Sequence, residues 1–324
     1  MADGWLYYPL FGAFMGCLFG RKILMFRVAF GMAMTIGGVV LLAAAGSARS
    51  MDLPDIRSVE PDLQIPPLSE GQPAAGKRVR QTLPEYEDTD VHHILYLPTD
   101  WRPDSRYPVI VEYAGNQWRN DRTGDACTGE VEDSKLGYGM SGGRGFIWVC
   151  MPYVNAAEKR NEATWWGDVA ATVDYCKKAV RQVCEKWCGD SSAVILTGFS
   201  RGAIACNYIG LHDDEIAGLW LAFAPYSHYD GVREWSYPRS DRASVLERLA
   251  RLRDRAVFVC QERGVEATRQ YIESTGVKAP FTYQPIGFHN HNDAWVLRPV
   301  AERQALRTWL KQVLEARPGR EGKD

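Results

Sequence analysis

The segment from Ala193 to Ala205 constrains the fold of this chain more than any other stretch. Its sequence is Ala-Val-Ile-Leu-Thr-Gly-Phe-Ser-Arg-Gly-Ala-Ile-Ala, in which an apolar, β-branched run leads into Gly-x-Ser-x-Gly and then into residues that can begin a helix. A serine at such a sharp strand-to-helix turn has a strained backbone, and the strand and helix leave no room for a Cβ atom two positions before or after it. Gly198 and Gly202 meet this requirement. The segment therefore predicts a strand, a turn and a helix with Ser200 at the turn, where it is a candidate nucleophile.

Backbone N–H groups close to this turn are candidates for stabilising a developing oxyanion. The N-terminus of a helix presents free N–H groups and the positive end of the helix dipole, so the N–H of Arg201 is one candidate donor. A second candidate follows the apolar segment 107–113, which leads into Ala114-Gly115-Asn116. A loop of small residues there can approach a bound ester oxygen, and the donor would be the N–H of Gly115 or Asn116. A tight turn without a function is the alternative interpretation of this loop.

Strand and helix patterns alternate along the rest of the chain. Apolar and β-branched runs predict strands over 91–97, 107–113, 146–151, 193–199, 218–225, 256–260 and 281–286. Helical spacing predicts helices over 162–187, 242–253 and 295–315, together with one directly after Ser200 and one that ends near Ser274. Such alternation predicts an α/β protein with a mostly parallel central sheet and helices on both faces.

One glycine-rich segment matches a nucleotide-binding motif in sequence but not in its predicted structural context. The residues from Gly137 to Gly142 match G-x-G-x-x-G, but they precede the strand predicted over 146–151, whereas a phosphate-binding loop must follow a strand and open a helix. We therefore predict no nucleotide site here. The net charge of −2 also gives no electrostatic reason to expect a nucleic-acid partner.

The first 48 residues have the pattern of an export segment. Arg21, Lys22 and Arg27 precede a nearly uncharged run over 28–45, and Gly-Ser-Ala follows at 46–48. We expect a cleaved signal peptide, with an uncleaved membrane anchor as the alternative, and in both cases a secreted or periplasmic location. After it we expect an extended linker or arm over 49–90, a catalytic domain over 91–318 and a tail over 319–324.

Seven of the eight cysteines lie after the export segment, so at least one thiol there has no disulfide partner. A bridge between Cys127 and one of Cys176, Cys184 and Cys188 is an open possibility. No C-x-x-C pair occurs, and we expect no zinc ribbon and no metal site.

Taken together, the chain resembles the α/β-hydrolase family, and within it secreted esterases related to polyhydroxybutyrate depolymerases and to feruloyl or acetylxylan esterases. The resemblance covers roughly residues 91–314. It is carried by Gly198-Phe199-Ser200-Arg201-Gly202 and by a histidine-containing loop, 287–293, after the last predicted core strand. It implies the α/β-hydrolase fold and transfer of an acyl group to water through a serine ester, without a metal or an organic cofactor.

The resemblance places the general base on the loop 287–293, which contains two histidines. We favour His291, because His-Asn-Asp followed by an aromatic residue and the final helix is similar to a segment of such esterases, and we keep His289 as the alternative. The acid is less well defined, since Gly264 stands near the position where the family often has Asp. Glu262 is the first candidate, because Glu can replace Asp in the triad. Glu266 and Asp230 are the alternatives.

Aromatic residues are expected on loops at the active-site end of the sheet. Stacking walls of this kind suit sugar or phenolic groups, and equally lipid or a buried loop. The candidates for substrate binding are Trp118, Tyr153, Trp165, Trp166 and Tyr226. The sequence thus predicts an exported serine carboxylic ester hydrolase, with small esters or polysaccharide-linked esters as its partners and membrane contact only through an uncleaved N-terminal segment. The alternatives are a serine peptidase of the same fold and a non-catalytic surface scaffold that binds a ligand.

Overall fold

An eight-stranded sheet forms the centre of the protein, which we describe from a computed structural model over residues 53–317. The strands follow the order β1-β2-β6-β3-β9-β10-β11-β12 across the sheet. Adjacent strands from β6 to β12 are parallel, and β1 and β2 pair antiparallel at one edge. The bounds are β1 Arg78–Gln81, β2 His93–Tyr96, β3 Tyr107–Tyr113, β6 Ile147–Met151, β9 Gly189–Phe199, β10 Ala222–Tyr226, β11 Ala256–Glu262 and β12 Phe281–Ile286. The predicted mostly parallel sheet is therefore confirmed.

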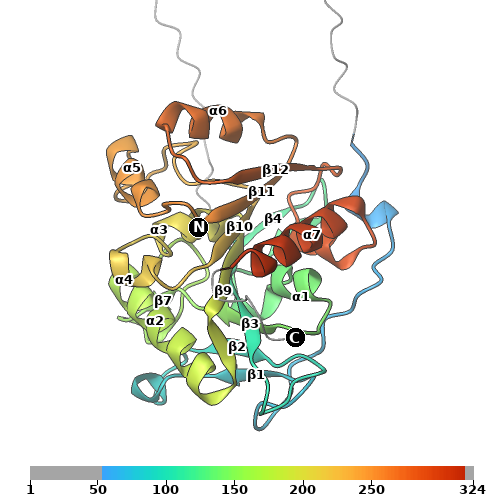
Figure 1. Cartoon of the computed structure of the whole chain (residues 1–324), viewed down its shortest axis with the longest axis vertical. Coiled ribbons are helices and arrows are strands. Elements are labelled where there is room, and N and C mark those ends of the chain that lie inside the picture. Colours follow the sequence, from blue (N-terminus) through green and yellow to red (C-terminus); the bar gives the residue numbers. More distant parts are fainter. Residues whose placement is uncertain (1–52, 318–324) are drawn as a thin grey trace, which may run out of the picture. The chain divides into compact units, whose positions relative to one another are not determined.

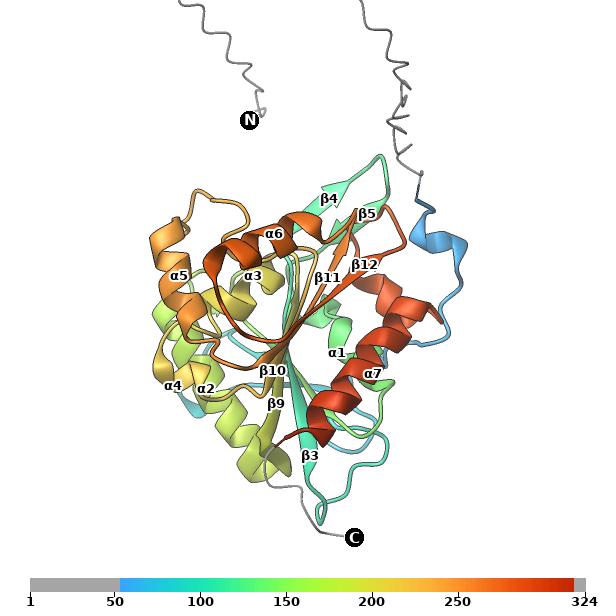
Figure 2. The same ribbon diagram turned by 45° about the horizontal axis from the view of Figure 1, so that its top comes forward.

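Helices cover both faces of this sheet (Figure 1). α1 and α7 lie on one face, and α2 to α6 lie on the other, as the rotated view also shows (Figure 2). The helices are α1 Leu136–Ser141, α2 Val169–Lys186, α3 Arg201–Tyr208, α4 Asp214–Ala217, α5 Arg242–Ala250, α6 Glu266–Thr275 and α7 Ala301–Glu315. Two short hairpins and four 3-10 helices complete the described chain: β4 Trp118–Asn120, β5 Asp125–Cys127, β7 Val154–Asn155, β8 Arg160–Asn161, η1 Ile56–Ser58, η2 Pro84–Tyr86, η3 Val131–Asp133 and η4 Asp293–Leu297.

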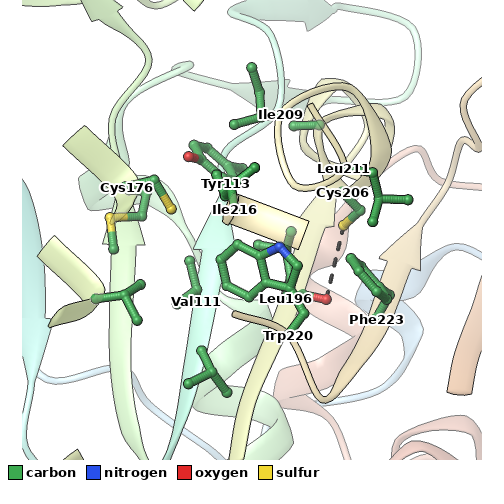
Figure 3. Packing of buried hydrophobic residues seen from close by; sticks show 14 of the residues in the cluster. Val111, Tyr113, Cys176, Leu196, Cys206, Ile209, Leu211, Ile216, Trp220 and Phe223 are labelled. Atoms are coloured by element: carbon green, nitrogen blue, oxygen red, sulfur yellow. Dashed lines mark hydrogen bonds between the residues drawn. The ribbon is translucent and has the colours of Figure 1, made fainter. Parts of the chain in front are cut away.

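The alternation of apolar side chains along the strands explains the two helical layers. In β9, Val194 and Leu196 belong to the core beneath α2 and α3, whereas Ile195 belongs to the core beneath α1 and α7. Successive side chains of a strand point to opposite faces, so a strand that is apolar throughout is buried on both. Figure 3 shows the first of these cores, where Val111, Leu196 and Phe223 from three adjacent strands pack together.

The start of α3 lies directly against the end of β3. A Cβ atom at Gly202 would come within 1.9 Å of the carbonyl oxygen of Tyr113, and one at Gly198 would come within 2.3 Å of the backbone of Gly202. Both glycines are therefore required by close packing of backbone on backbone, as the sequence predicted. This contact also fixes the loop after β3 beside the N-terminus of α3.

Replacing Gly202 by alanine is expected to lower the free energy of unfolding by about 3 kcal/mol or more, because neither backbone segment can move away without breaking the sheet. Gly145→Ala is the matched control. A Cβ at Gly145 meets no atom within 4 Å, so only its positive φ of 68° should cost stability, about 1 kcal/mol. Urea denaturation of the two variants checks this difference, and equal losses would contradict it.

The segment expected to be a linker or arm is in part a component of the sheet. β1 adds an edge strand next to β2, and Ile56 and Leu83 are buried. The described domain therefore begins well before Val91, and the predicted boundary is wrong. Four strand residues among many Pro, Glu and Asp show no periodicity that could reveal such a strand. The predicted export segment 1–48 and tail 319–324 lie outside the described residues, so export stays a prediction. Between residues 53 and 317, no helix is long and apolar enough to cross a bilayer.

Two predicted helices are shorter than expected. The helix predicted over 162–187 begins at Val169, where the side chain of Asp168 caps it by accepting the N–H of Ala171, and the residues before it form a loop. The helix predicted over 295–315 is divided by Pro299 into η4 and α7.

The glycine-rich segment 137–142 forms most of α1 rather than a loop. Added Cβ atoms at Gly137 and Gly139 would collide with Trp148 and Val296 at 2.2 Å and 2.3 Å, so these glycines serve close packing. The suggested disulfide is also absent, since all seven cysteines of the described chain, Cys127 included, are free thiols.

Candidate active site

Ser200 lies at the turn between β9 and α3, in the position that the sequence predicts. Its backbone has φ 54° and ψ −111°, an uncommon conformation for a residue with a side chain. The N–H of Ser200 donates to the carbonyl oxygen of Tyr226 on the adjacent strand at 3.0 Å, which helps to hold the turn. The residue is 7% exposed and lies at the carboxyl end of the sheet.

His291 connects Ser200 to Glu262. The imidazole Nε2 lies 3.0 Å from Ser200 Oγ, and Nδ1 lies 2.6 Å from Glu262 Oε1. Glu262 is the last residue of β11, and His291 lies on the loop between β12 and η4, so the three groups come from separate strand ends. A serine, an imidazole and a carboxylate in this order form the geometry of a nucleophile, its general base and the group that orients the base.

The environment of Glu262 keeps its carboxyl ionised. Burial opposes ionisation, but the hydrogen bonds with His291 and Ser227 outweigh it and hold the pKa of Glu262 below its ordinary value. An ionised carboxylate can only accept, so it fixes His291 in the tautomer that carries hydrogen on Nδ1. Nε2 then has a free lone pair directed at the hydroxyl of Ser200.

The predicted oxyanion donors lie around Ser200, and the side chain of Arg201 holds the loops that carry them. Arg201 is the first residue of α3, so its N–H has no acceptor within the helix. Its buried guanidinium donates to the carbonyl oxygens of Gly115 at 2.8 Å, Gly129 at 3.2 Å, Glu162 at 3.2 Å and Trp165 at 2.5 Å. One cation therefore ties three loops together beside the nucleophile.

The second predicted donor lies in the loop after β3. Gly115 follows the backbone that packs on α3, and the Asn116 side chain is fixed because its Oδ1 accepts the N–H of Trp165 at 2.7 Å. The backbone N–H groups of Gly115 and Asn116 find no hydrogen-bond acceptor among residues 53–317. Both therefore stay candidates for donation to a ligand.

The β4–β5 hairpin supports the loop that carries His291, a feature that the sequence did not reveal. Asp125 Oδ1 accepts the side-chain amides of Asn290 at 3.0 Å and Asn292 at 3.3 Å, one on each side of His291. The Oδ1 of Asn290 accepts the N–H of Ile56 at 2.7 Å. This buried carboxylate thus anchors both neighbours of the candidate base.

The alternative residues for base and acid lie elsewhere in the structure. His289 Nδ1 lies 2.7 Å from the carbonyl oxygen of Leu53, away from Ser200. Glu266 is exposed at the first position of α6, and Asp230 forms a buried ion pair with Arg248 at 2.9 Å. Within residues 53–317, none of the three forms a hydrogen bond or ion pair with Ser200 or His291.

Three of the five aromatic residues predicted to bind substrate are buried, and for them the prediction is wrong. Tyr153 and Tyr226 each donate a hydroxyl hydrogen to a backbone carbonyl, and Trp166 packs 4.4 Å from the ring of Tyr208. These rings fill the protein interior next to the loops rather than the surface above Ser200.

Trp118 and Trp165 are half-buried and remain candidates for substrate binding. The Trp118 ring centre lies 5.0 Å from that of His291, and Trp165 lies 5.4 Å from Trp235. The structure adds two residues on the loop after β10 that the sequence did not single out. His228 lies 5.5 Å from His291 and 5.7 Å from Trp235, ring centre to ring centre.

Several solved structures share the fold of this chain at low sequence identity. A thermostable esterase is 17% identical with a TM-score of 0.44, and it aligns over 72% of this chain and 62% of its own. A candidate dipeptidyl aminopeptidase IV from Bacteroides ovatus is 14% identical with a TM-score of 0.52. The alignment covers 72% of this chain and 35% of the aminopeptidase. An acetyl ester-xyloside bifunctional hydrolase from Caldicellulosiruptor lactoaceticus is 13% identical with a TM-score of 0.49. The alignment covers 75% of this chain and 98% of the hydrolase.

This chain therefore spans only part of the first two proteins, about two thirds and one third of their lengths. No protein-family model and no curated protein sequence matches it. The order and directions of the eight strands, with the serine turn after β9 and the histidine loop after β12, define the α/β-hydrolase fold.

Proposed function

We propose that this protein is a serine hydrolase that cleaves carboxylic esters, with Ser200 as nucleophile, His291 as general base and Glu262 as the acid that orients the base. The observation that supports this most directly is the position of His291, which is within hydrogen-bond distance of both other groups. The strained turn at Ser200 is a second argument, because a backbone of this kind persists where function requires it.

The proposed reaction follows from these distances. His291 Nε2 takes the proton of Ser200 as Oγ forms a bond to the ester carbonyl carbon, and the carbonyl oxygen becomes an oxyanion. When the bond to the alcohol oxygen breaks, the imidazolium gives its proton to the departing alcohol, and Ser200 keeps the acyl group. Water then repeats the attack with His291 as base, which releases the acid and restores Ser200.

The oxyanion would be stabilised by the N–H of Arg201 and by the N–H of Gly115 or Asn116. Donors that are fixed before the reaction need no rearrangement as charge develops, and each contributes a large share of the acceleration. The Arg201 guanidinium contributes at a distance, because it holds the carbonyl of Gly115 and the loop that carries Trp165.

We further propose that the substrates are neutral esters, with polysaccharide-linked esters as candidates. Two half-buried tryptophans, Trp118 and Trp165, border the site, and indole rings stack well on sugar faces. The pKa of His228 is lowered to about 4, because burial and the neighbouring His291 disfavour its charged form. This second imidazole is therefore uncharged at neutral pH and offers a polar contact without attracting anions.

A fluorophosphonate probe tests the proposal, since it reacts only with an activated serine. We expect one covalent adduct per chain, located on Ser200 by peptide mass spectrometry, together with turnover of p-nitrophenyl acetate and butyrate. Ser200→Ala should lose both, whereas Ser105→Ala, which changes an exposed serine, should retain both. Absence of an adduct and of ester turnover in the unmutated protein would contradict the proposal. Turnover of an aminoacyl p-nitroanilide but not of esters would favour a peptidase.

A further inference from the structure

We propose that Ser227 is a positioning residue of this site, whose hydroxyl holds Glu262 and His291 in their working arrangement. The inference rests on the proposed function, because it assigns Ser227 a role in the same reaction. Ser227 directly follows β10, so it comes from a strand end that supplies none of the other three groups. The geometry, the backbone and the burial of this residue each support the assignment.

The hydroxyl of Ser227 contacts both members of the acid and base pair. Its Oγ lies 3.0 Å from Glu262 Oε1, to which it donates, and 3.0 Å from His291 Nδ1. Within residues 53–317, Ser227 and His291 are the two side chains that donate to Glu262, and the other carboxylate oxygen, Oε2, is buried without a partner. Removal of the hydroxyl would therefore leave His291 as the single side-chain anchor of a buried carboxylate.

The backbone of Ser227 has a conformation that a serine adopts only at a cost. Its φ is 85°, in the left-handed region where glycine is favoured. The N–H of Ser227 donates to the carbonyl of Cys260 at 2.9 Å, and its own carbonyl accepts the side chain of Gln261 at 3.2 Å. Glycine would fit this backbone better, so the presence of serine indicates a use for its hydroxyl.

Ser227 is buried on the side of His291 opposite to Ser200. The residue is 6% exposed, and its hydroxyl contacts Nδ1 of His291, whereas Nε2 of the same ring faces Ser200. A positive charge develops on the imidazole as the proton leaves Ser200, and a fixed carboxylate stabilises that charge. Loss of the hydroxyl should therefore slow the chemical step while leaving substrate binding unchanged.

Three substitutions separate this role from a structural one. Ser227→Ala keeps the strained backbone and removes the hydroxyl, and we expect kcat to fall about 10-fold to 100-fold with KM unchanged, as for loss of a hydrogen bond to a buried charged group. Ser227→Gly also relieves the strain, so kcat should fall as much while Tm lies above that of Ser227→Ala by about 2 °C or more. Ser227→Thr keeps a hydroxyl at the cost of a β-branched side chain, so kcat should stay within about 3-fold while Tm falls.

The matched control is Arg253→Gly. Arg253 is exposed in the turn after α5 with a φ of 55°, at the end of the sheet opposite to the site. Its replacement relieves the same kind of backbone strain and should raise Tm without changing kcat. Of these two glycine variants, only Ser227→Gly should therefore lose kcat.

The kinetic outcomes distinguish this inference from the proposed function. If the unmutated protein hydrolyses p-nitrophenyl butyrate, Ser200→Ala does not, and Ser227→Ala retains kcat within twofold, the role of Ser227 is wrong and the hydrolase stands. A rise in KM with unchanged kcat would also overturn it, because the hydroxyl would then contact substrate. A Ser227→Thr variant as slow as Ser227→Ala would count against it too. Full activity of Ser200→Ala would overturn the proposed function itself.

Discussion

Replacement of His291 by alanine is expected to lower kcat/KM for p-nitrophenyl butyrate by about 10⁴-fold or more. Removal of the base leaves Ser200 as a neutral alcohol, because no other imidazole reaches its hydroxyl, and removal of one triad member costs nearly as much as removal of all of them. The donors around the oxyanion remain, so a small residual rate above that of water should persist. Steady-state kinetics with each variant at the same pH provides the measurement.

His289→Ala is the matched control, because His289 lies two residues away on the same loop. It packs against the segment near Leu53 and should affect stability more than catalysis, with kcat/KM within about 3-fold of the unmutated protein. A large loss in His289→Ala with a small loss in His291→Ala would exchange the two assignments. Losses of equal size would instead indicate a general disturbance of the loop.

Replacement of Glu262 by glutamine is expected to lower kcat by about 10³-fold to 10⁴-fold with little effect on KM. Glutamine has nearly the same shape, but it lacks the charge that stabilises the imidazolium, and its amide can present a donor to Nδ1 and so select the wrong tautomer. The negative charge is present in the resting site, since hydrogen bonds hold the pKa of Glu262 below its ordinary value against the effect of burial.

The control for Glu262→Gln is Glu266→Gln, which makes the same chemical change at an exposed position in α6. That variant should retain kcat within about twofold. Thermal unfolding of both proteins shows whether an effect on kcat accompanies a loss of structure. If Glu262→Gln kept a tenth or more of the activity, Glu262 would not be the acid of the triad.

The sequence predicted the parts of the site that depend on local pattern. Gly198, Ser200 and Gly202 could be placed because a sharp turn between a strand and a helix demands small residues at fixed spacing. The strand over 107–113 was predicted with the bounds that the structure has, because a buried parallel strand is a nearly continuous apolar run bounded by turns. The strand over 281–286 was also predicted with its bounds, although it lies at the edge of the sheet and is largely half-buried or exposed. The loop that contains His291 followed from its place after the last of these strands.

Contacts between distant segments could not be predicted in this way. Asp125 supports the histidine loop from a hairpin 165 and 167 residues earlier in the sequence, and nothing in its neighbourhood distinguishes it from a surface aspartate. The role of Ser227 depends on a left-handed backbone that a serine gives no reason to expect. The acid remained open among three residues for the same reason, since only tertiary structure shows which carboxylate faces His291.

The aromatic residues were misplaced because position after a strand does not determine burial. Tyr153 and Trp166 follow β6 and precede α2, as residues of an active-site loop would, but their rings turn inward and pack on each other at 5.7 Å. A loop above a sheet needs an apolar layer beneath it, and large rings supply that layer as readily as they supply a binding surface.

The anchoring of the histidine loop has a consequence for how the protein is made. Asn290 accepts the N–H of Ile56, and His289 lies against the carbonyl of Leu53, across separations of 234 and 236 residues. A chain emerging from a ribosome exposes residues 53–56 well before residues 289–291, so these contacts can form only after the intervening segment has been made. Under the proposed function, the nascent chain stays inert toward esters until residues 289–291 have been translated. Activity thus reports that synthesis has passed the histidine loop.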